Sequence, residues 1–254
     1  CIGMVFNDDA NIAPNYDATL ELTSLSDRGI LLDNELRYIG NETSSLLNIA
    51  YIDSDDKFLD DRYLYSFLDT RKLINNINYS NQMPLGLSLN SELSYSRISD
   101  LKYFDDFGNS LSTASQSSVK REWRLFGEKF MNNGIIDYEL SSLSYQPSQS
   151  GVDEQYETSP SLKVNYTNTQ RDNPYMYSVK ASLDKFTHKD STKSEGTRYL
   201  IYPSIELPIQ TESWELTPKF GIRHVDYSMD RGSSSSTSKT TPIFSLRGKV
   251  YLEK

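Results

Sequence analysis

The spacing of the turns constrains this sequence more than any other feature. From Asp53 onward, long polar loops alternate with short turns, and the segments between them alternate apolar and polar residues. In the clearest segment, residues 84–97, the apolar positions are Leu85, Leu87, Leu89, Leu93 and Tyr95, and the polar positions are Gly86, Ser88, Asn90, Glu92, Ser94 and Ser96. Successive side chains of a strand point to opposite faces, so such a strand has one apolar and one polar face. This layout is typical of a bacterial outer-membrane β-barrel.

The same pattern along the whole chain predicts twelve strands. The predicted strands lie at residues 16–25, 30–38, 47–51, 62–80, 84–97, 119–130, 136–145, 162–166, 175–183, 200–207, 214–222 and 244–252. Segments joined by short turns are antiparallel neighbours, and several of these are longer than the five or six residues common in soluble sheets. The expected fold class is therefore all-β, an antiparallel up-and-down transmembrane β-barrel of about twelve strands.

Several local signals refine the expected strands. Asp27-Arg28-Gly29 and Asn132-Asn133-Gly134 are predicted to be hairpin turns, because Asn and Gly tolerate the positive φ of a tight turn. In the strand at 200–207, Leu200, Tyr202, Ile205 and Leu207 are the apolar positions, and Pro203 interrupts the pairing. We expect a β-bulge at Pro203.

Composition narrows the class of partner. The net charge of −9 argues against a nucleic-acid partner, whose phosphates favour basic protein surfaces. The chain has 18 Tyr and 2 Trp, and Tyr suits the headgroup level of a bilayer because its ring is apolar and its tip polar. No stretch approaches the roughly 18 apolar residues of a membrane helix, but a barrel strand is only half apolar.

The first ten residues do not fit the pattern and are left unassigned. Cys1 is the single cysteine, so these 254 residues form no internal disulfide. The run from Cys1 to Phe6 lacks the basic start and the cleavage pattern of a signal peptide. We therefore expect a mature chain or an excised segment; a lipidated Cys1 is the alternative.

Few residues are candidates for chemistry. His188 lies in a predicted loop beside Lys189 and Asp190, whereas His224 alternates with Ile222 and Phe220 on an apolar face. Two acidic groups lie in predicted loops and are interpreted as solvated rather than as a metal site, because EF-hand spacing is absent: Asp53, Asp55, Asp56, Asp60 and Asp61, and Asp100, Asp105 and Asp106. No nucleophile motif or dinucleotide fingerprint is present, so we expect no enzyme activity, no metal and no cofactor.

Four segments, in the same order along the chain, resemble a known family. Residues 11–20 (NIAPNYDATL) resemble the opening barrel segment of the LptD family of lipopolysaccharide-assembly proteins, also called OstA or organic solvent tolerance proteins. Residues 26–38 correspond to its "RG…EFRYL" segment, residues 99–107 (SDLKYFDDF) to its "SDxxYFxDF" loop, and residues 195–203 to its "ATR…P" strand. The resemblance runs from Asn11 to about the chain end.

The resemblance implies a domain organisation and a function. It implies that residues 11–254 are an outer-membrane β-barrel segment, the N-terminal part of a barrel larger than twelve strands. It also implies a Gram-negative outer-membrane translocon component that inserts lipopolysaccharide into the outer leaflet. The implied partners are lipopolysaccharide, the lipoprotein plug LptE and the periplasmic bridge protein LptA. Prolines in the family's first strands weaken pairing at a lateral gate, and Pro14 lies at the corresponding place.

Two other functions remain open from the residues alone. Twelve is an even number of strands, so the chain could close on itself as a porin-like passive channel, with the first predicted strand paired to the last. An outer-membrane hydrolase with His188 or His224 as its base is the third hypothesis.

Overall fold

The computed structural model describes most of the chain. The described residues are 5–13, 15–26, 28–40, 43–52, 64–69, 77–78, 88–99, 101, 103–104, 117–168, 174–231 and 236–251. In this part of the chain, no helix is both long enough and apolar enough to cross a membrane.

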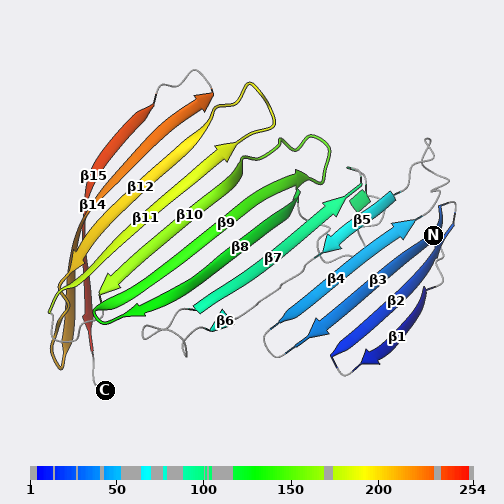
Figure 1. The fold of residues 1–254 in the computed structure, drawn as a ribbon, viewed down its shortest axis with the longest axis horizontal. Coiled ribbons are helices and arrows are strands. Elements are labelled where there is room, and N and C mark those ends of the chain that lie inside the picture. The colour runs from blue at the N-terminus through cyan, green and yellow to red at the C-terminus, as the bar shows by residue number, and fades with distance from the viewer. Residues whose placement is uncertain are drawn as a thin grey trace. The chain divides into compact units, whose positions relative to one another are not determined.

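The described residues form antiparallel strands in sequence order (Figure 1). Their bounds are β1 Val5–Ala13, β2 Tyr16–Leu25, β3 Gly29–Ile39, β4 Ser44–Ile52, β5 Leu64–Asp69, β6 Ile77–Asn78, β7 Ser88–Ile98, β8 Ser118–Met131, β9 Gly134–Pro147, β10 Glu157–Asn168, β11 Met176–Thr187, β12 Glu195–Glu206, β13 Ile209–Gln210, β14 Trp214–Arg231 and β15 Thr237–Val250. Each of the twelve predicted segments overlaps at least one of these strands, and the segment 62–80 overlaps two, β5 and β6. The structure adds β1 and the two-residue strand β13.

Neighbours along the chain are neighbours in the sheet. The strand order is β1-β2-β3-β4-β5-β7-β8-β9-β10-β11-β12-β14, with β15 and β13 beside β14 and β6 beside β7. The predicted up-and-down topology is therefore confirmed.

The first predicted strand does not close a twelve-strand barrel. That strand is β2, and both of its edges are occupied: Ala18 pairs with Leu36 of β3 on one side and with Ala10 of β1 on the other. Within the described residues no strand pairing joins β15 to β1. The expected porin-like closure between the first and last predicted strands is wrong, because β1 takes the edge that closure requires.

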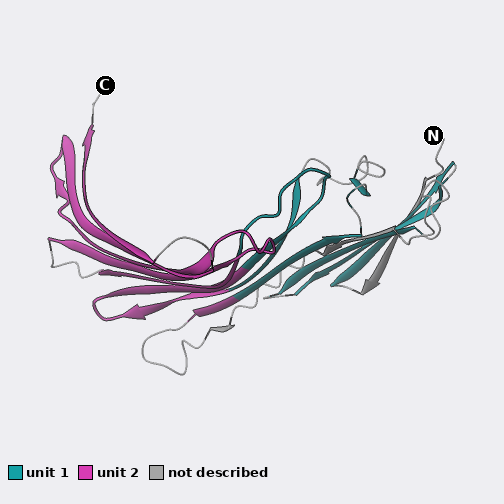
Figure 2. Ribbon diagram, turned by 90° about the horizontal axis from the view of Figure 1, so that it is seen from above, with its two compact units in different colours: residues 1–76, 91–124, 143–157 teal, residues 77–90, 125–142, 158–254 magenta. Residues whose placement is uncertain are grey.

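The chain divides into two compact units (Figure 2). Unit 1 comprises Cys1–Asn76, Ser91–Arg124 and Leu143–Glu157, and unit 2 comprises Ile77–Asn90, Leu125–Ser142 and Thr158–Lys254. The strands β7, β8 and β9 each contribute one end to each unit.

In unit 1 the strands carry one apolar and one polar face. Leu22 pairs with Leu32 and Leu36 with Leu47, so these residues share a face across β2, β3 and β4. The intervening positions include Glu21, which pairs with Asp33. Leu20, Leu22 and Leu36 are exposed on the first face. We call the two sides the apolar face and the polar face; exposed Leu on one side is the arrangement that a lipid-facing strand requires.

A small core lies where the strands of unit 1 meet the long loops. It consists of Leu31, Ala50, Ile52, Ile98, Tyr103, Phe104 and Val119. Ile52 and Ile98 are the last residues of β4 and β7, and Tyr103 follows β7 in the loop. Tyr103 is 1% exposed, and its ring meets that of Phe104 edge-on at 5.7 Å. The loop that carried the "SDxxYFxDF" resemblance is therefore anchored by its two aromatic residues.

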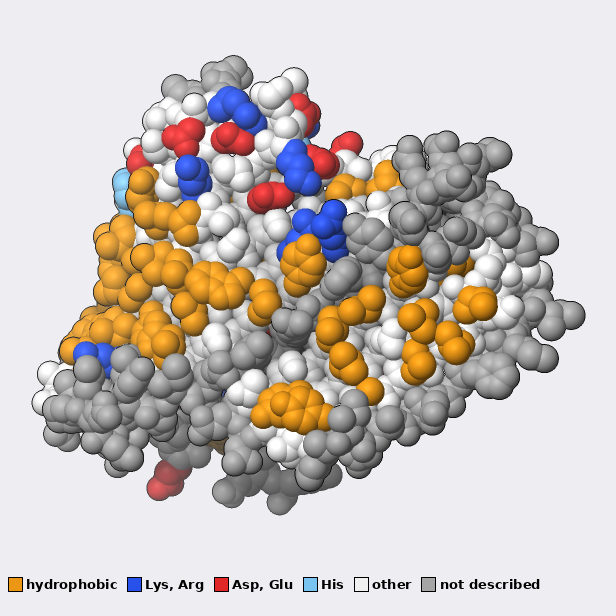
Figure 3. Space-filling view, turned by 45° about the vertical axis from the view of Figure 1, so that its right-hand side comes forward, with side chains coloured by type: hydrophobic (Ala, Val, Ile, Leu, Met, Phe, Trp, Pro, Cys, Tyr) orange, Lys and Arg blue, Asp and Glu red, His pale blue; other side chains and the backbone are white. Residues whose placement is uncertain are grey.

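Unit 2 has the same two faces. Leu183 pairs with Tyr199, Ala181 with Ile201 and Tyr177 with Ile205, and these positions form the apolar face of β11 and β12. On β14 and β15 the same face carries Phe220 opposite Phe244, and both are exposed. In Figure 3 hydrophobic side chains gather in a band, and most charged side chains lie to one side of it.

The predicted faces of β12 need a correction. Ile201, Pro203 and Ile205 lie on the apolar face, whereas Leu200 and Tyr202 lie on the polar face opposite Ser182 and Lys180. The pairing with β11 continues without a shift through Pro203, so the bulge expected there is wrong. The expected interruption of pairing is found with β14, where Tyr202 and Pro203 have no partners and the register is unchanged. The pairing between β12 and β14 shifts instead between Glu195 and Gly196. Proline lacks only the N–H group, and its Cβ fits an extended strand, so the strand passes through Pro203 without an extra residue.

Aromatic side chains on the apolar face gather at the short-turn ends. In unit 1, Tyr16 at the start of β2 and Tyr38 near the end of β3 have ring centroids 4.5 Å apart. In unit 2, Tyr166 and Tyr177 lie 5.9 Å apart at the ends of β10 and β11. An aromatic girdle at this position is a property of membrane-spanning β-sheets.

Two predicted turns are confirmed, with different roles for their glycines. Gly29 has a φ of 111°, which favours glycine at the turn between β2 and β3. Gly134, by contrast, is the first residue of β9, and a Cβ there would lie 2.6 Å from the Tyr166 ring. The glycine of the Asn132-Asn133-Gly134 turn therefore makes room for an aromatic ring on the neighbouring strand.

Candidate functional site

The polar face of unit 2 contains a hollow of about 680 Å³. It lies over five successive strands and the end of β7. Its lining residues are Ser88, Asn90, Phe126, Gly127, Glu128, Asp137, Tyr138, Glu139, Lys163, Val164, Asn165, Lys180, Ala181, Ser182 and Leu200. The volume falls in the range of small-molecule sites, and most of the lining side chains are polar or charged. Alternation along the strands produces this lining, because every second residue of each strand reaches the same face.

Most polar groups of the hollow bind one another across neighbouring strands. Lys163 Nζ of β10 lies 2.9 Å from Glu139 Oε1 of β9. Two residues further along the same strands, toward the short turn, Asn165 Nδ2 donates to Asp137 Oδ2 at 2.8 Å. Such cross-strand pairs stabilise the sheet modestly because their members remain partly exposed.

Lys180 is the exception. Its side chain is exposed and lines the hollow, and no hydrogen bond or ion pair joins it to another described residue. It lies on β11 opposite Tyr202. The hollow therefore presents one uncompensated ammonium group together with carboxylate, amide and hydroxyl groups. That combination suits a ligand with phosphate or carboxylate groups and many hydroxyls.

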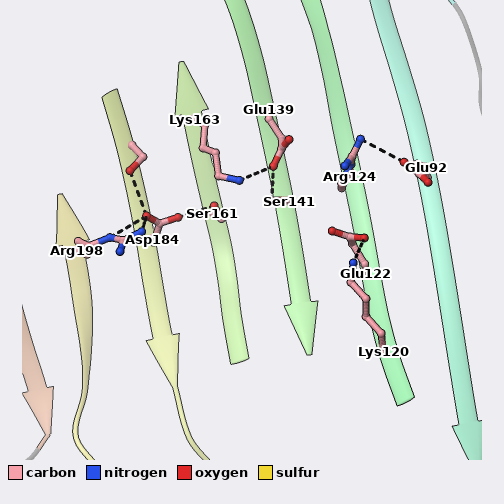
Figure 4. A network of polar contacts seen from close by, with 11 residues as sticks. Glu92, Lys120, Glu122, Arg124, Glu139, Ser141, Ser161, Lys163, Asp184 and Arg198 are labelled. Carbon is pink, nitrogen blue, oxygen red and sulfur yellow. Dashed lines mark hydrogen bonds and ion pairs between the residues drawn. The ribbon is translucent and has the colours of Figure 1, made fainter. Parts of the chain in front are cut away.

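Beyond the hollow, a buried carboxylate organises three strands (Figure 4). Asp184 of β11 is 3% exposed. Its Oδ1 accepts a hydrogen bond from Ser161 Oγ at 2.6 Å, and its Oδ2 accepts from Arg198 at 2.8 and 3.2 Å. Ser182 Oγ donates to Oδ2 at 3.2 Å. The carboxylate is thus compensated by a guanidinium and two hydroxyls, which a buried charge requires.

Unit 1 has ion pairs on its polar face as well. Arg124 of β8 lies 3.3 Å from Glu92 of β7, and Lys120 lies 2.6 Å from Glu122 along β8 (Figure 4). Both pairs follow the alternation of polar positions. The polar face of each unit is therefore lined by paired charges rather than by charges of one sign.

The two histidines occupy different environments. His224 lies on the apolar face opposite Ile201, as predicted, and its Nδ1 is 2.8 Å from Thr240 Oγ1 of β15. His188 is in the predicted loop but is only 7% exposed. Its Nδ1 accepts a hydrogen bond from the Asp190 N–H at 3.0 Å. His188 is therefore a buried residue whose side chain stabilises the conformation of its own loop.

Arg231, the last residue of β14, holds the same loop. Its guanidinium donates to the carbonyl oxygens of His188, Asp190 and Lys193 at 3.0, 3.2 and 3.3 Å. It also lies 2.9 Å from Glu195 Oε1. Within the loop, hydrogen bonds from the Thr192 backbone and side chain lower the pKa of Asp190 below its ordinary value. The loop is therefore a folded element.

Other predicted residues cannot be placed. Pro14, Asp53, Asp55, Asp56, Asp60, Asp61, Asp100, Asp105 and Asp106 lie outside the described residues. In the described part of the chain, no three or more His, Cys, Asp or Glu side chains are grouped to hold a metal ion.

Sequence reasoning missed Asp184, Arg198 and Lys180. Lys180 lies at a polar position of the predicted strand 175–183, whereas Asp184 and Arg198 lie just beyond the predicted strands 175–183 and 200–207, in residues that the structure adds to β11 and β12. Alternation assigns charged residues of a strand to the polar face, but it does not tell which of them pair with charged residues of the neighbouring strands. Register decides this, since Asp184 stands opposite Arg198 and Lys180 opposite Tyr202.

The two faces, the aromatic ends and the alternation of loops and turns define a class. This is a transmembrane β-sheet of the outer-membrane type. The family model described as "LptD: LPS transport system D" matches residues 60–254, and the chain belongs to that family. LptD-family proteins are outer-membrane proteins of Gram-negative bacteria.

Curated relatives agree with this family. The chain is 30% identical over 247 residues to the LPS-assembly protein LptD of Aromatoleum aromaticum, covering 96% of this chain and 29% of the relative. It is 29% identical over 261 residues to that of Nitrosospira multiformis, covering 96% and 26%. For that of Nitrosomonas eutropha the values are 27% over 255 residues, with 96% and 33% covered. The chain thus spans about a third or less of the relatives' length.

Proposed function

We propose that this chain is part of an outer-membrane translocon that inserts lipopolysaccharide into the outer leaflet. The observation that carries the proposal is the family match to an LPS transport system over residues 60–254, on a sheet with one apolar and one polar face. In this function no covalent bond is made or broken, so neither His188 nor His224 acts as a base.

The polar face supports a route for the lipopolysaccharide headgroup. Sugars and phosphates need hydroxyl, amide and cationic partners, and the hollow of unit 2 offers Asn90, Ser182 and the unpaired Lys180. Acyl chains find no such surface there. They would leave sideways, between strands, toward the hydrocarbon that the apolar face contacts.

A lateral exit needs a seam of weak pairing. We propose that Pro14, between β1 and β2, contributes to that seam, because proline has no N–H for the ladder. The pairing between β1 and β2 is irregular between Asn11 and Ala13, next to this proline. An interrupted ladder costs less to open than a continuous one.

The partners and the domain limits follow from the same proposal. We propose that residues 11–254 are the barrel segment, which the described part of β1 extends to Val5. In the complete protein the polar face would contact the lipoprotein plug LptE, and LptA would deliver lipopolysaccharide from the periplasm. The relatives' length, about three times that of this chain or more, leaves room for the strands that close the barrel.

A depletion experiment tests the proposal. Depleting the full-length protein should remove newly made lipopolysaccharide from the cell surface, measured by surface labelling of its sugars. Complementation with Lys180→Gln should restore surface lipopolysaccharide only in part. Its level should be roughly threefold to tenfold lower than after complementation with the wild-type protein, since one charge-assisted contact is lost. The matched control is Lys239→Gln on β15, which also lies on the polar face but does not line the hollow. Normal surface display after depletion would rule the function out.

A further inference from the structure

The apolar face of unit 1 carries two arginines near the long-loop ends of β7 and β8. Arg97 is the next-to-last residue of β7, and Arg121 is the fourth of β8. Arg97 pairs with Phe67 and alternates with Leu93 and Tyr95 on the apolar face. Arg121 lies over the ring of Tyr95, with its Cζ 5.3 Å from the ring centroid, so it shares this face.

Arg121 is held in place before any ligand arrives. Its Nε donates to the Ser96 carbonyl at 3.2 Å, and its Nη2 donates to Gln146 Oε1 at 2.5 Å. Gln146 in turn donates to the Ile98 carbonyl at 2.9 Å. These contacts use two of the five N–H groups of the guanidinium and leave the others for a further acceptor. A fixed guanidinium loses little entropy when it binds an anion.

Neither Arg97 nor Arg121 forms an ion pair with a described residue, although Asp69 of β5 pairs with Tyr95 on the same face. Arg97 is exposed and makes no hydrogen bond or ion pair with another described residue. On the apolar face, the described side chains of β4 (Ser45, Leu47, Ile49 and Tyr51) and of β8 near Arg121 (Val119 and Trp123) are uncharged. The chain as a whole has a net charge of −9, so two arginines without an ion pair on one face are a local exception.

The aromatic neighbours indicate the depth of the patch in a bilayer. Trp123 is 37% exposed two residues beyond Arg121, and Tyr95 lies beneath the guanidinium. Tyr and Trp on a lipid-facing surface lie at the headgroup level, and arginines at strand ends extend toward that level. Arg97 and Arg121 therefore lie at the depth where lipid headgroups are found.

We propose that Arg97 and Arg121 bind the anionic phosphate headgroup of a lipid in the surrounding leaflet, whose chains lie along Leu93 and Trp123. Guanidinium groups recognise phosphate through paired N–H donors, and the aromatic ring under Arg121 directs those donors outward. The site rests on the apolar face contacting lipid and is independent of the transport proposal. It would hold one lipid at a fixed place on the sheet.

Lipid retention tests the site. The full-length protein is reconstituted in vesicles of equal phosphatidylglycerol and phosphatidylcholine, extracted in mild detergent, and its bound lipids are counted by native mass spectrometry. The wild-type protein should retain phosphatidylglycerol in preference to phosphatidylcholine. Arg97→Gln should weaken that preference about fivefold, and the double variant with Arg121→Gln should weaken it about 25-fold, since each cation near a membrane contributes a similar increment. Inorganic phosphate should not displace the lipid, because it lacks the acyl chains.

Two controls make the outcome decisive. Lys185→Gln removes an exposed cation from the apolar face of β11, where it pairs with Thr197 and makes no cation–π contact with a described residue. It should leave the preference unchanged; an equal loss would show that any cation on this face suffices and would overturn the site. Because Arg97 makes no hydrogen bond or ion pair with a described residue, Arg97→Gln decides the matter even if the double variant fails to fold. Equal retention of both lipids by the wild-type protein also overturns the site, whereas the transport proposal depends on the depletion experiment.

Discussion

At the residue scale, Asp184 shows how the free-energy cost of burying a charged side chain is offset by its hydrogen-bond donors. A carboxylate that is 3% exposed must be compensated by donors, and it receives them from β10, β11 and β12. The Arg198 guanidinium also lies over the Phe186 ring, with its Cζ 5.3 Å from the centroid. These contacts tie three neighbouring strands together at one point, close to their long-loop ends.

Replacing Asp184 should therefore destabilise the fold. Asp184→Asn keeps the shape but leaves the partly buried Arg198 without its counter-charge, and we expect a loss of roughly 1–3 kcal/mol in the free energy of unfolding. The measurement is guanidinium unfolding of the full-length protein in lipid vesicles. Ser182→Ala, which removes one neutral hydrogen bond to the same carboxylate, is the matched control and should cost less. A double variant with Arg198→Met should recover part of the loss; if Asp184→Asn alone has no effect, the network does not hold the strands.

At the element scale, β12 shows the limit of reading faces from alternation. Its residues 199–205 are nearly all apolar, and both alternating sets look suitable for a lipid face. The pairing with β11 decides: Ile201 stands opposite Ala181, and Leu200 stands opposite Ser182. A shift of one residue would exchange the two sets, so only register assigns them.

A pair of lysine substitutions tests that assignment. Ile201→Lys places a charge on the apolar face, where Ile201 is 47% exposed, and should cost roughly 2–4 kcal/mol of folding free energy in a bilayer. Leu200→Lys places the same charge in the hollow of the polar face and should cost less. Assembly into the membrane can be followed by the heat-dependent gel mobility of folded outer-membrane proteins. Equal costs, or the reverse order, would contradict the register.

At the scale of the whole molecule, the free edges of β1 and β15 in the described residues are the dominant feature. In the described residues β1 pairs only with β2, and β15 pairs only with β14. Each of these end strands therefore presents a row of backbone N–H and C=O groups. In hydrocarbon such groups have no water to bind, and in water they favour pairing with other chains. The relatives' greater length supplies further residues that can cover these edges.

Residues 1–254 by themselves should therefore not form a stable monomer in a bilayer. Refolded in detergent micelles or vesicles, they should aggregate or associate through β1 and β15, whereas the full-length protein should give a monomer with heat-dependent gel mobility. Size-exclusion chromatography with light scattering compares the two. A monodisperse, heat-modifiable monomer from residues 1–254 would show that the sheet closes without further strands.

Much of the fold could be predicted from the sequence. Alternation placed all twelve strands, because burial in lipid on one side and contact with water on the other select residues with a period of two. The turns at Gly29 and Gly134 were found from their residue types, although Gly134 proved to accommodate the Tyr166 ring. β1 was missed because Val5 to Ala13 does not alternate in the expected way.

The candidate site could be predicted less well. Alternation indicates that Lys180 and Lys163 face water, but not that the first is unpaired and the second bound to Glu139. Asp184 lies beyond the predicted strand 175–183, and its burial was not predicted. His224 was placed correctly, since its position depends only on alternation within β14. The burial of His188 was not foreseen, and neither was the hydrogen bond to its carbonyl oxygen from Arg231, which is 43 residues away along the chain.

The sequence by itself therefore determined the class of this protein, which is an antiparallel membrane sheet with one apolar and one polar face. Its motifs also indicated the family. These properties are local, since they depend on the residue types within each strand and turn. Only the tertiary structure decided which charges pair, which edge of β2 is occupied and where the hollow lies. These properties depend on the register between strands, which is set by contacts across the sheet and has no signature within a single segment.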